Sequence, residues 1–240
     1  MKTCYYMLEP KEVIFVKMRH EIKHEISYQD MLVLRQRLQA VMRRDDYTID
    51  GKYKIRSLYF DNLTDKALRE KIDGVDEREK FRIRYYNDDT SFIRLEKKTK
   101  VSGLGNKQMD SLTAEEAQKI VDGDYEWMIE CTDRPLIIEL YNKMKFQGLR
   151  PKTIVDYTRE PFTIDAGHVR VTLDYNIRTG LKCTDFLNSD CIMIPAGDAN
   201  TIILEVKWDE FLPDIIRDIV QLEGRRGAAF SKYAVCRIYG

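Results

Sequence analysis

Short segments in which charged and apolar side chains alternate recur along this sequence. Successive side chains of a β-strand point to opposite faces, so each such segment predicts a strand with one charged face and one apolar face. In 79–86, for example, Lys80, Arg82 and Arg84 share one face, and the opposite face is aromatic or aliphatic. The same division is found in four further segments: 19–26, 91–98, 168–176 and 201–208.

The composition of the charged faces is the informative feature. An antiparallel sheet with one face in water also alternates, and for any single strand this is the simpler interpretation. Exposed faces usually carry Thr, Ser and Gln as well, whereas these five are almost wholly Arg, Lys and Glu. Like charges directly opposite each other are destabilising, so Arg82 and Arg84 beside other bases imply a bound anion. We therefore expect the charged faces to line an interior and the apolar faces to pack outward.

The remaining periodic segments supply the rest of the fold. Further strands are expected at 53–61 and 152–160, with weaker ones at 191–195 and 233–239. Amphipathic patterns predict helices at 28–44, 64–72, 113–122, 126–147 and 212–222. Apolar strand faces need cover, which such helices can provide from outside. The sequence therefore predicts an α+β fold: a closed or nearly closed antiparallel β-barrel with a polar interior and helices packed outside.

The chain is expected to form a single domain. It contains no internal repeat, low-complexity tract or linker that would divide residues 18–240. We expect residues 1–17 to be an N-terminal extension that is not native. Lys11-Glu12-Val13 can be encoded by a purine-rich ribosome-binding sequence a few codons before Met18, which would then be the native start.

Overall charge narrows the classes of function. The 40 Lys and Arg residues balance 40 Asp and Glu residues, whereas a generic nucleic-acid binder carries an excess of base. No apolar run approaches the roughly 18–20 residues of a membrane-spanning helix. Five cysteines without a C-x-x-C pair fit neither a zinc site nor a disulfide framework, so we expect a cytoplasmic protein. A net charge of zero still permits base to gather inside and acid outside.

An interior lined by cations would select a multiply charged anion. The planar fork of Arg makes bidentate contacts with phosphate, and Lys adds a mobile point charge. Carboxylates among the bases are expected to hold a divalent cation that bridges phosphate oxygens. The pattern thus indicates polyphosphate or a nucleoside triphosphate as ligand, although sulfated or carboxylated polymers would satisfy the same electrostatics.

Eight short motifs occur in order along the chain. They are Arg19-His20-Glu21-Ile22-Lys23, Ser57-Leu58-Tyr59-Phe60-Asp61, Arg78-Glu79-Lys80-Phe81-Arg82-Ile83-Arg84-Tyr85-Tyr86, Leu95-Glu96-Lys97-Lys98, Tyr157-Thr158-Arg159, Arg170-Val171-Thr172-Leu173-Asp174, Leu204-Glu205-Val206-Lys207 and Ser231-Lys232-Tyr233. The ordered set resembles the VTC (vacuolar transporter chaperone) domain, the polyphosphate polymerase branch of the triphosphate tunnel metalloenzymes. The resemblance spans nearly the whole chain, from Arg19 to Tyr239.

The resemblance implies a tunnel of antiparallel strands that holds a metal-bound triphosphate and extends polyphosphate from ATP. Residue by residue, it implies a basic lining of Lys23, Arg82, Arg84, Lys98, Lys107, Arg159, Arg170 and Lys232. Lys107 is followed by Gln108-Met109, where the family pattern is more basic. Glu205 matches the glutamate that holds Mn²⁺ or Mg²⁺, and Glu21 and Glu96 are further candidates for binding the metal or orienting a lysine.

One departure from the wider superfamily bears on the reaction. The first strand reads Arg-x-Glu-x-Lys, where hydrolytic members have Glu-x-Glu-x-Lys, and this favours the polymerase branch. The expected catalytic residues are Lys23, Arg82, Arg84, Lys98, Arg159 and Glu205, and the expected phosphate-binding residues are Lys107, Arg170, Lys207 and Lys232. Phosphoryl transfer depends mainly on positioning and charge neutralisation, which such a set can supply.

The leading hypothesis is a metal-dependent polyphosphate polymerase that transfers the γ-phosphate of ATP to a growing chain. A metal-dependent triphosphate hydrolase on the same fold is the first alternative. A non-catalytic module that binds polyphosphate or inositol phosphates is the second. We expect ATP and polyphosphate, and no nucleic acid, as ligands. A membrane-protein partner at the inner face of the membrane is compatible with the resemblance, and the oligomeric state is left open.

Overall fold

The computed structural model describes residues 19–102, 104–222, 224, 227 and 229–238. The predicted extension, residues 1–17, lies outside this range. The strands are β1 (His20–Ile26), β2 (Arg43–Arg44), β3 (Tyr53–Asp61), β4 (Arg78–Tyr86), β5 (Asp89–Val101), β6 (Leu104–Leu112), β7 (Arg150–Ile164), β8 (Val169–Thr179), β9 (Ile194–Pro195) and β10 (Ile202–Trp208). The helices are α1 (Tyr28–Val41), α2 (Lys66–Ile72), α3 (Ala114–Asp122), α4 (Pro135–Gln147), α5 (Asp214–Val220) and α6 (Lys232–Ile238), with 3-10 turns η1 (Glu126–Glu130) and η2 (Ala166–His168).

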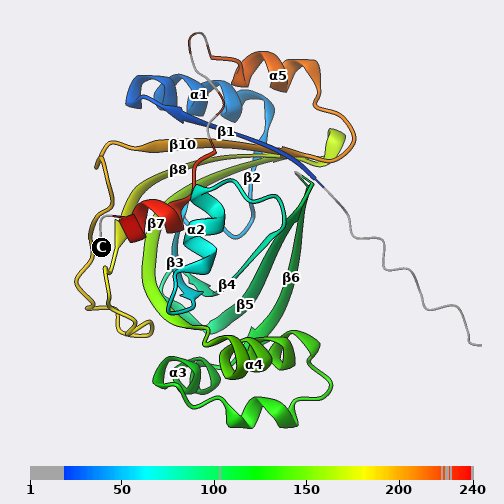
Figure 1. The fold of residues 1–240 in the computed structure, drawn as a ribbon. Coiled ribbons are helices and arrows are strands. Elements are labelled where there is room, and N and C mark those ends of the chain that lie inside the picture. The colour runs from blue at the N-terminus through cyan, green and yellow to red at the C-terminus, as the bar shows by residue number, and fades with distance from the viewer. Residues whose placement is uncertain (1–18, 103, 223, 225–226, 228, 239–240) are drawn as a thin grey trace, which may run out of the picture.

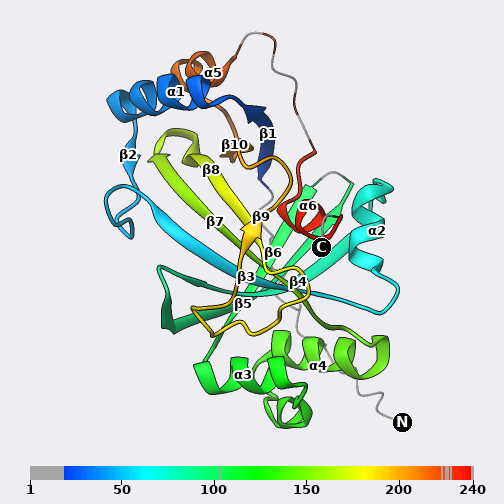
Figure 2. The ribbon, with the colours of Figure 1, turned by 90° about the vertical axis from the view of Figure 1, so that its left-hand side faces the viewer.

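All ten strands join one sheet, and eight of them form its continuous path in the order β1-β10-β8-β7-β3-β4-β5-β6. Every pairing is antiparallel, and the sheet curls into a half-barrel (Figures 1 and 2). Its edge strands, β1 and β6, are not hydrogen-bonded to each other. The expectation of a closed barrel is therefore wrong. The gap between the two edges of the sheet is bridged by side chains and not by backbone hydrogen bonds, since Lys98 Nζ of β5 lies 3.2 Å from Glu21 Oε2 of β1.

Helices cover the outer face of the half-barrel in two places. Helices α1 and α5 lie over β1, β10 and β8, and α3 and α4 lie over the β4–β5 side (Figure 1). Leu34 and Leu38 of α1 are fully buried against the first group, and Leu140 of α4 is fully buried against the second. The outer position predicted for the apolar strand faces is thus confirmed.

The concave side contains a third apolar cluster. Tyr233 and Cys236 of α6 pack on Ile55 of β3 and Val155 of β7, on the inner face of the sheet. Tyr233 also stacks on Tyr59 at 5.0 Å between ring centroids. The interior is therefore divided: part of it is filled by α6, and only the rest is polar.

Most helices and strands lie where the periodicity and the capping residues of the sequence predict them. Thr113 caps α3 as predicted, with a reciprocal capping box to Glu116. The helix expected at 126–147 is interrupted, because the chain forms η1 and then restarts at Pro135, a residue suited to a first helical turn.

One expected strand is not formed, and one observed strand was not expected. The strand expected at 233–239 is absent from its described part, since Lys232–Ile238 is the helix α6. Strand β6 was not expected, because Leu104–Leu112 has few strand-forming residues. It forms by pairing along its whole length with β5, from Val101↔Leu104 to Ile93↔Leu112.

No helix within the described residues is both long and apolar enough to cross a membrane.

The burial of α4 leads to a prediction about stability. Leu140→Ala should lower the free energy of unfolding by about 2–5 kcal/mol, because it leaves a cavity between α4 and the sheet. Urea denaturation followed by circular dichroism measures this loss. The matched control is Leu63→Ala, since Leu63 is 88% exposed and should shift stability by no more than about 0.5 kcal/mol. Equal, small losses in the two variants would contradict the proposed packing.

Candidate functional site: a basic cavity on the concave face

A cavity of about 1040 Å³ opens on the concave side of the sheet. Its lining comes mainly from β1, β4, β5, β6 and α2, with contributions from β3, β7, β8, β10 and the segment before α6. Among the described residues that line it, two are acidic, Glu21 and Glu79, and thirteen are basic. The basic residues are Arg19, Lys23, Lys71, Arg78, Lys80, Arg82, Arg84, Lys98, Lys100, Lys107, Arg159, Arg170 and Lys207.

Buried carboxylates beneath the lining hold many of these cations in place. The first is Glu96 of β5, whose side chain is 3% exposed. It accepts a hydrogen bond of 2.6 Å from Arg82 Nε and lies 2.5 Å from Lys107 Nζ. Burial acts to raise the pKa of Glu96, but Arg82, Arg84 and Lys107 outweigh it and hold that pKa well below its usual range. Glu96 therefore stays ionised and orients cations from β4 and β6.

Arg84 is fixed by neutral groups as well as by charge. Its Nε donates to Ser57 Oγ at 2.9 Å, and its Nη2 donates to Tyr157 Oη at 3.0 Å. Its nearest carboxylate contact is 3.9 Å, to Glu96. The guanidinium is thus held rigidly with little charge compensation.

The second group of carboxylates lies where β1 pairs with β10. Lys23 Nζ contacts Glu21 and lies 3.3 Å from Glu205 Oε2, so both carboxylates converge on one ammonium. Lys207 Nζ lies 2.5 Å from Glu205 Oε1. Burial and the neighbouring Glu205 act to raise the pKa of Glu21, but Lys23, Lys98 and Lys207 lower it to about 2.

The third group contains one carboxylate, Asp174 of β8, which has no solvent exposure. Arg159 donates two hydrogen bonds to it, from Nε at 2.6 Å and from Nη2 at 2.7 Å, and Lys232 Nζ donates a third at 2.6 Å. Arg170 is held separately, by Asp45 Oδ2 at 2.9 Å and Tyr53 Oη at 2.6 Å. Asp174 thus joins β7, β8 and α6 behind the cavity.

The structure brings nearly all the predicted site residues together. Those that line the cavity are Glu21, Lys23, Arg82, Arg84, Lys98, Lys107, Arg159, Arg170 and Lys207. The other three, Glu96, Glu205 and Lys232, lie behind the lining. Glu96 and Glu205 pair with lining cations directly, and Lys232 shares Asp174 with the lining residue Arg159. Their roles in catalysis and metal binding stay predictions.

Several lining residues are absent from the predicted set. Lys80 was placed on the charged face by its alternation but not assigned a role. Arg78 and Lys100 continue the same face by two residues on β4 and β5, a spacing that could have identified them. Lys71 comes from α2, and no sequence signal indicates that this helix lies beside the cavity.

Lys80 and Tyr59 form an unusual titratable pair on the cavity wall. The Lys80 ammonium lies 5.6 Å from the centroid of the Tyr59 ring, and Arg82 Nη1 donates to Tyr59 Oη at 2.8 Å. Burial, together with Lys98 and Arg82, lowers the pKa of Lys80 to about 7. Burial acts to raise the pKa of Tyr59, but the cations Arg82, Lys80 and Arg84 lower it to about 7. In the free cavity, Tyr59 and Lys80 therefore lose their protons near neutral pH, because the positive charge around them is incompletely balanced by carboxylates.

The residues present also fit a small oxygen-preferring cation. Mg²⁺ and similar ions are usually bound by one or two carboxylates, with substrate phosphates and water completing the shell. Glu21 and Glu205 supply such a pair, because both reach the single ammonium of Lys23. Within the described part of the chain no group of three or more metal-ligating side chains occurs, and Glu96 lies in the separate cluster with Arg82.

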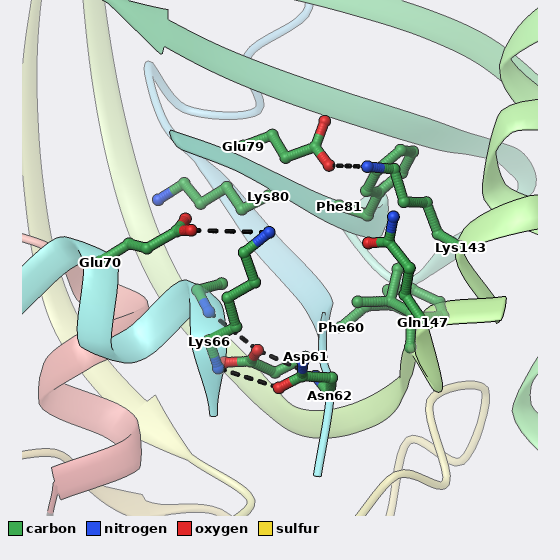
Figure 3. A pocket seen from close by; sticks show the side chains of 12 residues that line it. Phe60, Asp61, Asn62, Lys66, Glu70, Glu79, Lys80, Phe81, Lys143 and Gln147 are labelled. Atoms are coloured by element: carbon green, nitrogen blue, oxygen red, sulfur yellow. Dashed lines mark hydrogen bonds and ion pairs between the residues drawn. The ribbon is translucent and has the colours of Figure 1, made fainter. Parts of the chain in front are cut away.

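A second, much smaller pocket lies beside the first residues of β4, between α2 and α4, and shares Glu79 and Lys80 with the basic cavity (Figure 3). It has mixed charge: Glu79 pairs with Lys143, and Lys66 Nζ lies 3.6 Å from Glu70 Oε1. Lys80 is drawn in Figure 3 extending away from the Glu79–Lys143 pair. Because its charges are internally balanced, this pocket is a weaker candidate than the basic cavity.

The fold and the cavity together define a class: an open antiparallel half-barrel, covered by helices outside, with a dense cation cluster on its concave face. The family model of the VTC domain matches residues 18–238 of this chain. The chain therefore belongs to the VTC domain family, and the predicted resemblance is confirmed.

No curated protein matches the sequence. Among solved structures, the chain is similar to a proposed adenylate cyclase from Bacillus halodurans, with 12% sequence identity, a TM-score of 0.46 and coverage of 80% of both chains. It is also similar to the PH1819 protein from Pyrococcus horikoshii, with 13% identity, a TM-score of 0.46 and coverage of 90% of this chain and 97% of that one.

The lowered pKa values lead to a prediction about proton linkage. A bound polyanion favours the neutral phenol of Tyr59 and the ammonium of Lys80, so binding should raise both pKa values and take up protons. The contribution of this pair to affinity is then full below pH 7 and is lost as pH rises above it. Ultraviolet difference spectra should show a phenolate that titrates near pH 7 in the free protein and at higher pH with tripolyphosphate.

The control for this titration is Tyr59→Phe, which should lack the low-pH phenolate while the other tyrosines titrate normally. A wild-type spectrum without that phenolate, or one that tripolyphosphate leaves unchanged, would contradict the predicted linkage.

Proposed function

We propose that this protein is a polyphosphate polymerase that transfers the γ-phosphate of ATP to the end of a polyphosphate chain inside the basic cavity. The observation that carries the proposal is the composition of the cavity lining. It contains thirteen Lys and Arg side chains and two acidic ones, in a member of the VTC domain family. Both substrates are polyanions, and their mutual repulsion is the main obstacle to the reaction. A concentrated set of fixed cations removes that obstacle.

The reaction requires little covalent chemistry from the side chains. The terminal phosphate oxygen of the polyphosphate attacks the γ-phosphorus of ATP, the bond to the β-phosphate oxygen breaks, and ADP leaves. The attacking oxygen is already anionic, so no general base is needed. Arg82, Arg84 and Lys23 are proposed to hold the reacting phosphates. The hydrogen bonds to Glu96 and Ser57 keep Arg82 and Arg84 in position.

A divalent cation, Mn²⁺ or Mg²⁺, is part of the proposal. Glu205 and Glu21 would hold it, in the place where Lys23 now joins the two carboxylates. When bound, such an ion neutralises charge on the β- and γ-phosphate oxygens. Lys23 and Lys207 would then be released from the carboxylates and become available to phosphate.

The carboxylates of the cavity give the hydrolase alternative little support. Hydrolysis needs a positioned water and a group that accepts its proton. The carboxylates Glu21, Glu96 and Glu205 are each engaged by at least two cations, which lowers their pKa values and weakens them as bases. None of the three carboxylates is thus a good base toward water. Tyr59 and Lys80, with pKa values of about 7, are the groups of the cavity wall suited to accept a proton.

One assay separates the three functions. Purified protein is incubated with ATP and Mn²⁺, and the products are resolved on a polyacrylamide gel and assayed for free phosphate. Long-chain polyphosphate is expected. Free phosphate without polymer would contradict the polymerase and support the triphosphate hydrolase. Binding of polyphosphate without ATP turnover would contradict both enzymes and support the binding module.

Substitution of the proposed metal ligand gives a sharper prediction. Glu205→Gln should abolish polymer formation and weaken Mn²⁺ binding, because it removes a carboxylate charge while keeping the side-chain shape. Polyphosphate binding should be retained or strengthened, since the cavity loses a negative charge. Calorimetry with Mn²⁺ and with polyphosphate measures both effects separately from turnover.

Glu115→Gln serves as the matched control, because Glu115 is 78% exposed on α3, far from the cavity. It should leave all three measurements unchanged. Undiminished turnover in Glu205→Gln would remove Glu205 from the proposed metal site.

A further inference from the structure

Two free cysteines lie in direct contact in the loop that joins β8 to β9. Cys191 Sγ donates to Cys183 Sγ at 2.6 Å, and both side chains are half-buried. Their spacing in the sequence matches no redox motif of the C-x-x-C type. The pair is therefore a product of the fold.

The loop, residues 180–193, holds the two thiols together through its backbone. At its beginning, Cys183 N donates to the Gly180 carbonyl at 2.8 Å and forms a turn. At its end, β9 pairs with β8, so that Ile194 lies opposite Thr179. The strand pairing thus returns the second half of the loop, with the second cysteine, to the place where the first one lies.

The middle of the loop is docked on the outer face of β3 and β4 (Figure 2). Phe186 is fully buried against Tyr85 of β4, with ring centroids 4.8 Å apart, and Tyr85 Oη donates to the Phe186 carbonyl at 3.1 Å. Arg56 Nη1 of β3 donates to the Asn188 carbonyl at 2.6 Å. Both contacts fall between the two cysteines, so a disulfide would enclose the segment that is docked on the sheet.

The other cysteines of the described chain are isolated from this pair. Cys131 Sγ donates to the Trp127 carbonyl at 3.9 Å, and Cys236 Sγ donates to the Arg178 carbonyl at 3.8 Å. Cys236 is also fully buried, which raises the pKa of its thiol to about 12. Structural thiols of this kind are inert, because the thiolate is the reactive form.

The contact between the two loop cysteines gives them different chemical roles. Burial and the neighbouring Cys183 raise the pKa of the Cys191 thiol to about 11, so Cys191 is protonated at neutral pH. Cys191 donates the hydrogen bond and Cys183 accepts it. Cys183 is therefore the sulfur that attacks first, and Cys191 lies in place to attack Cys183 afterwards.

We propose that Cys183 and Cys191 form a redox-active dithiol, which reacts with small-molecule disulfides of the glutathione type and closes a reversible disulfide within the loop. First, Cys183 attacks one sulfur of the reagent: a mixed disulfide forms, the reagent's own S–S bond breaks, and one reagent thiol leaves with the proton of Cys183. Cys191 then attacks the Cys183 sulfur, and the second reagent thiol leaves with the proton of Cys191. Two cysteine thiols are thereby oxidised, and one reagent disulfide is reduced to two thiols.

The disulfide would stabilise the loop that supports the strands of the cavity from outside. Tyr85 and Arg56 are neighbours in sequence of Arg84 and Ser57, which hydrogen-bond to each other on the concave face. A cross-link restricts the unfolded chain while the docked loop keeps its contacts. The oxidised protein should therefore unfold at a temperature about 5–10 °C above that of the reduced protein.

The test uses the full wild-type chain, reduced, freed of reductant, incubated with glutathione disulfide and then alkylated. A protease that cleaves before aspartate separates the two cysteines, because Asp185 and Asp190 lie between them. Mass spectrometry should then show peptides 174–184 and 190–197 linked to each other, lighter by two hydrogen atoms than their sum and without bound glutathione. Dithiothreitol should release them. Differential scanning calorimetry of the oxidised and reduced samples measures the shift in unfolding temperature.

Two variants serve as matched controls. Cys183→Ser should lose both the link and the rise in unfolding temperature. Cys131→Ser removes a half-buried thiol outside the pair and should retain both. The reduced forms of both variants should unfold close to the reduced wild-type protein, and the peptide map of the wild-type protein needs no variant.

Several results would overturn this inference, which is independent of the proposed function. They are cysteines that stay reduced in excess glutathione disulfide, glutathione that remains on Cys183 because Cys191 does not displace it, and a disulfide from either residue to another cysteine. A linked protein that unfolds at the temperature of the reduced protein would also overturn it. A protein that forms the disulfide as predicted but makes no polymer from ATP would contradict the polymerase alone.

Discussion

The structure depends on the confinement of many positive charges within one concave surface. Such charges repel one another, and buried ones also lose their hydration, so the fold must supply compensation. It does so with carboxylates placed behind the cavity: Glu96, Asp174 and Glu205 are each at most 5% exposed. Each acid joins cations from neighbouring strands or from α6, so the same ion pairs hold the sheet together and arrange the site. An ion pair of this kind is costly to break, because removing one partner leaves a buried charge uncompensated.

The open form of the sheet follows from the same constraint. A barrel closed by backbone pairing between β1 and β6 would bring Lys107 of β6 closer to the charged inner face of β1, around a narrower interior. In the structure the edges remain apart, and the ion pair between Lys98 and Glu21 spans the gap. The cavity therefore keeps its volume, and part of its wall is made of side chains alone.

The sequence was sufficient to predict which residues face inward, because strand alternation has a fixed period of two. For the strand at 53–61 the predicted bounds are those of β3, and the face carrying Arg82 and Arg84 was assigned correctly. Closure could not be predicted, since it depends on how far an eight-strand sheet curls. Strand β6 was missed because its pairing with β5, rather than its own composition, stabilises it.

Which cations lie opposite a carboxylate and which lie opposite another cation could not be predicted either. Alternation shows that Lys80 and Arg82 share a face, but the cross-strand register decides that one meets Lys98 and the other meets Glu96. A shift of two residues in one direction would pair Lys80 with Glu96, and in the other direction Arg82 with Lys98, without moving any side chain to the other face. The position of Lys71 depends on how α2 folds back over the strands, which local sequence does not encode.

The net charge of zero is the sum of a strongly basic cavity lining and a remainder of the chain that is acidic. Since the cavity takes thirteen of the 40 basic residues and exposes two of the 40 acidic ones, the rest of the sequence carries an excess of acid. At physiological ionic strength the field of a charge is screened within about 8 Å. An anion at a distance therefore encounters no net attraction, and one at the opening encounters a dense positive surface. A long flexible polyanion can enter such a cavity by one end, because it needs only a few of its charges within that range at a time. For the proposed polyphosphate ligand, this arrangement would favour a flexible chain that enters by one end over a rigid duplex that has to approach the opening with its whole width.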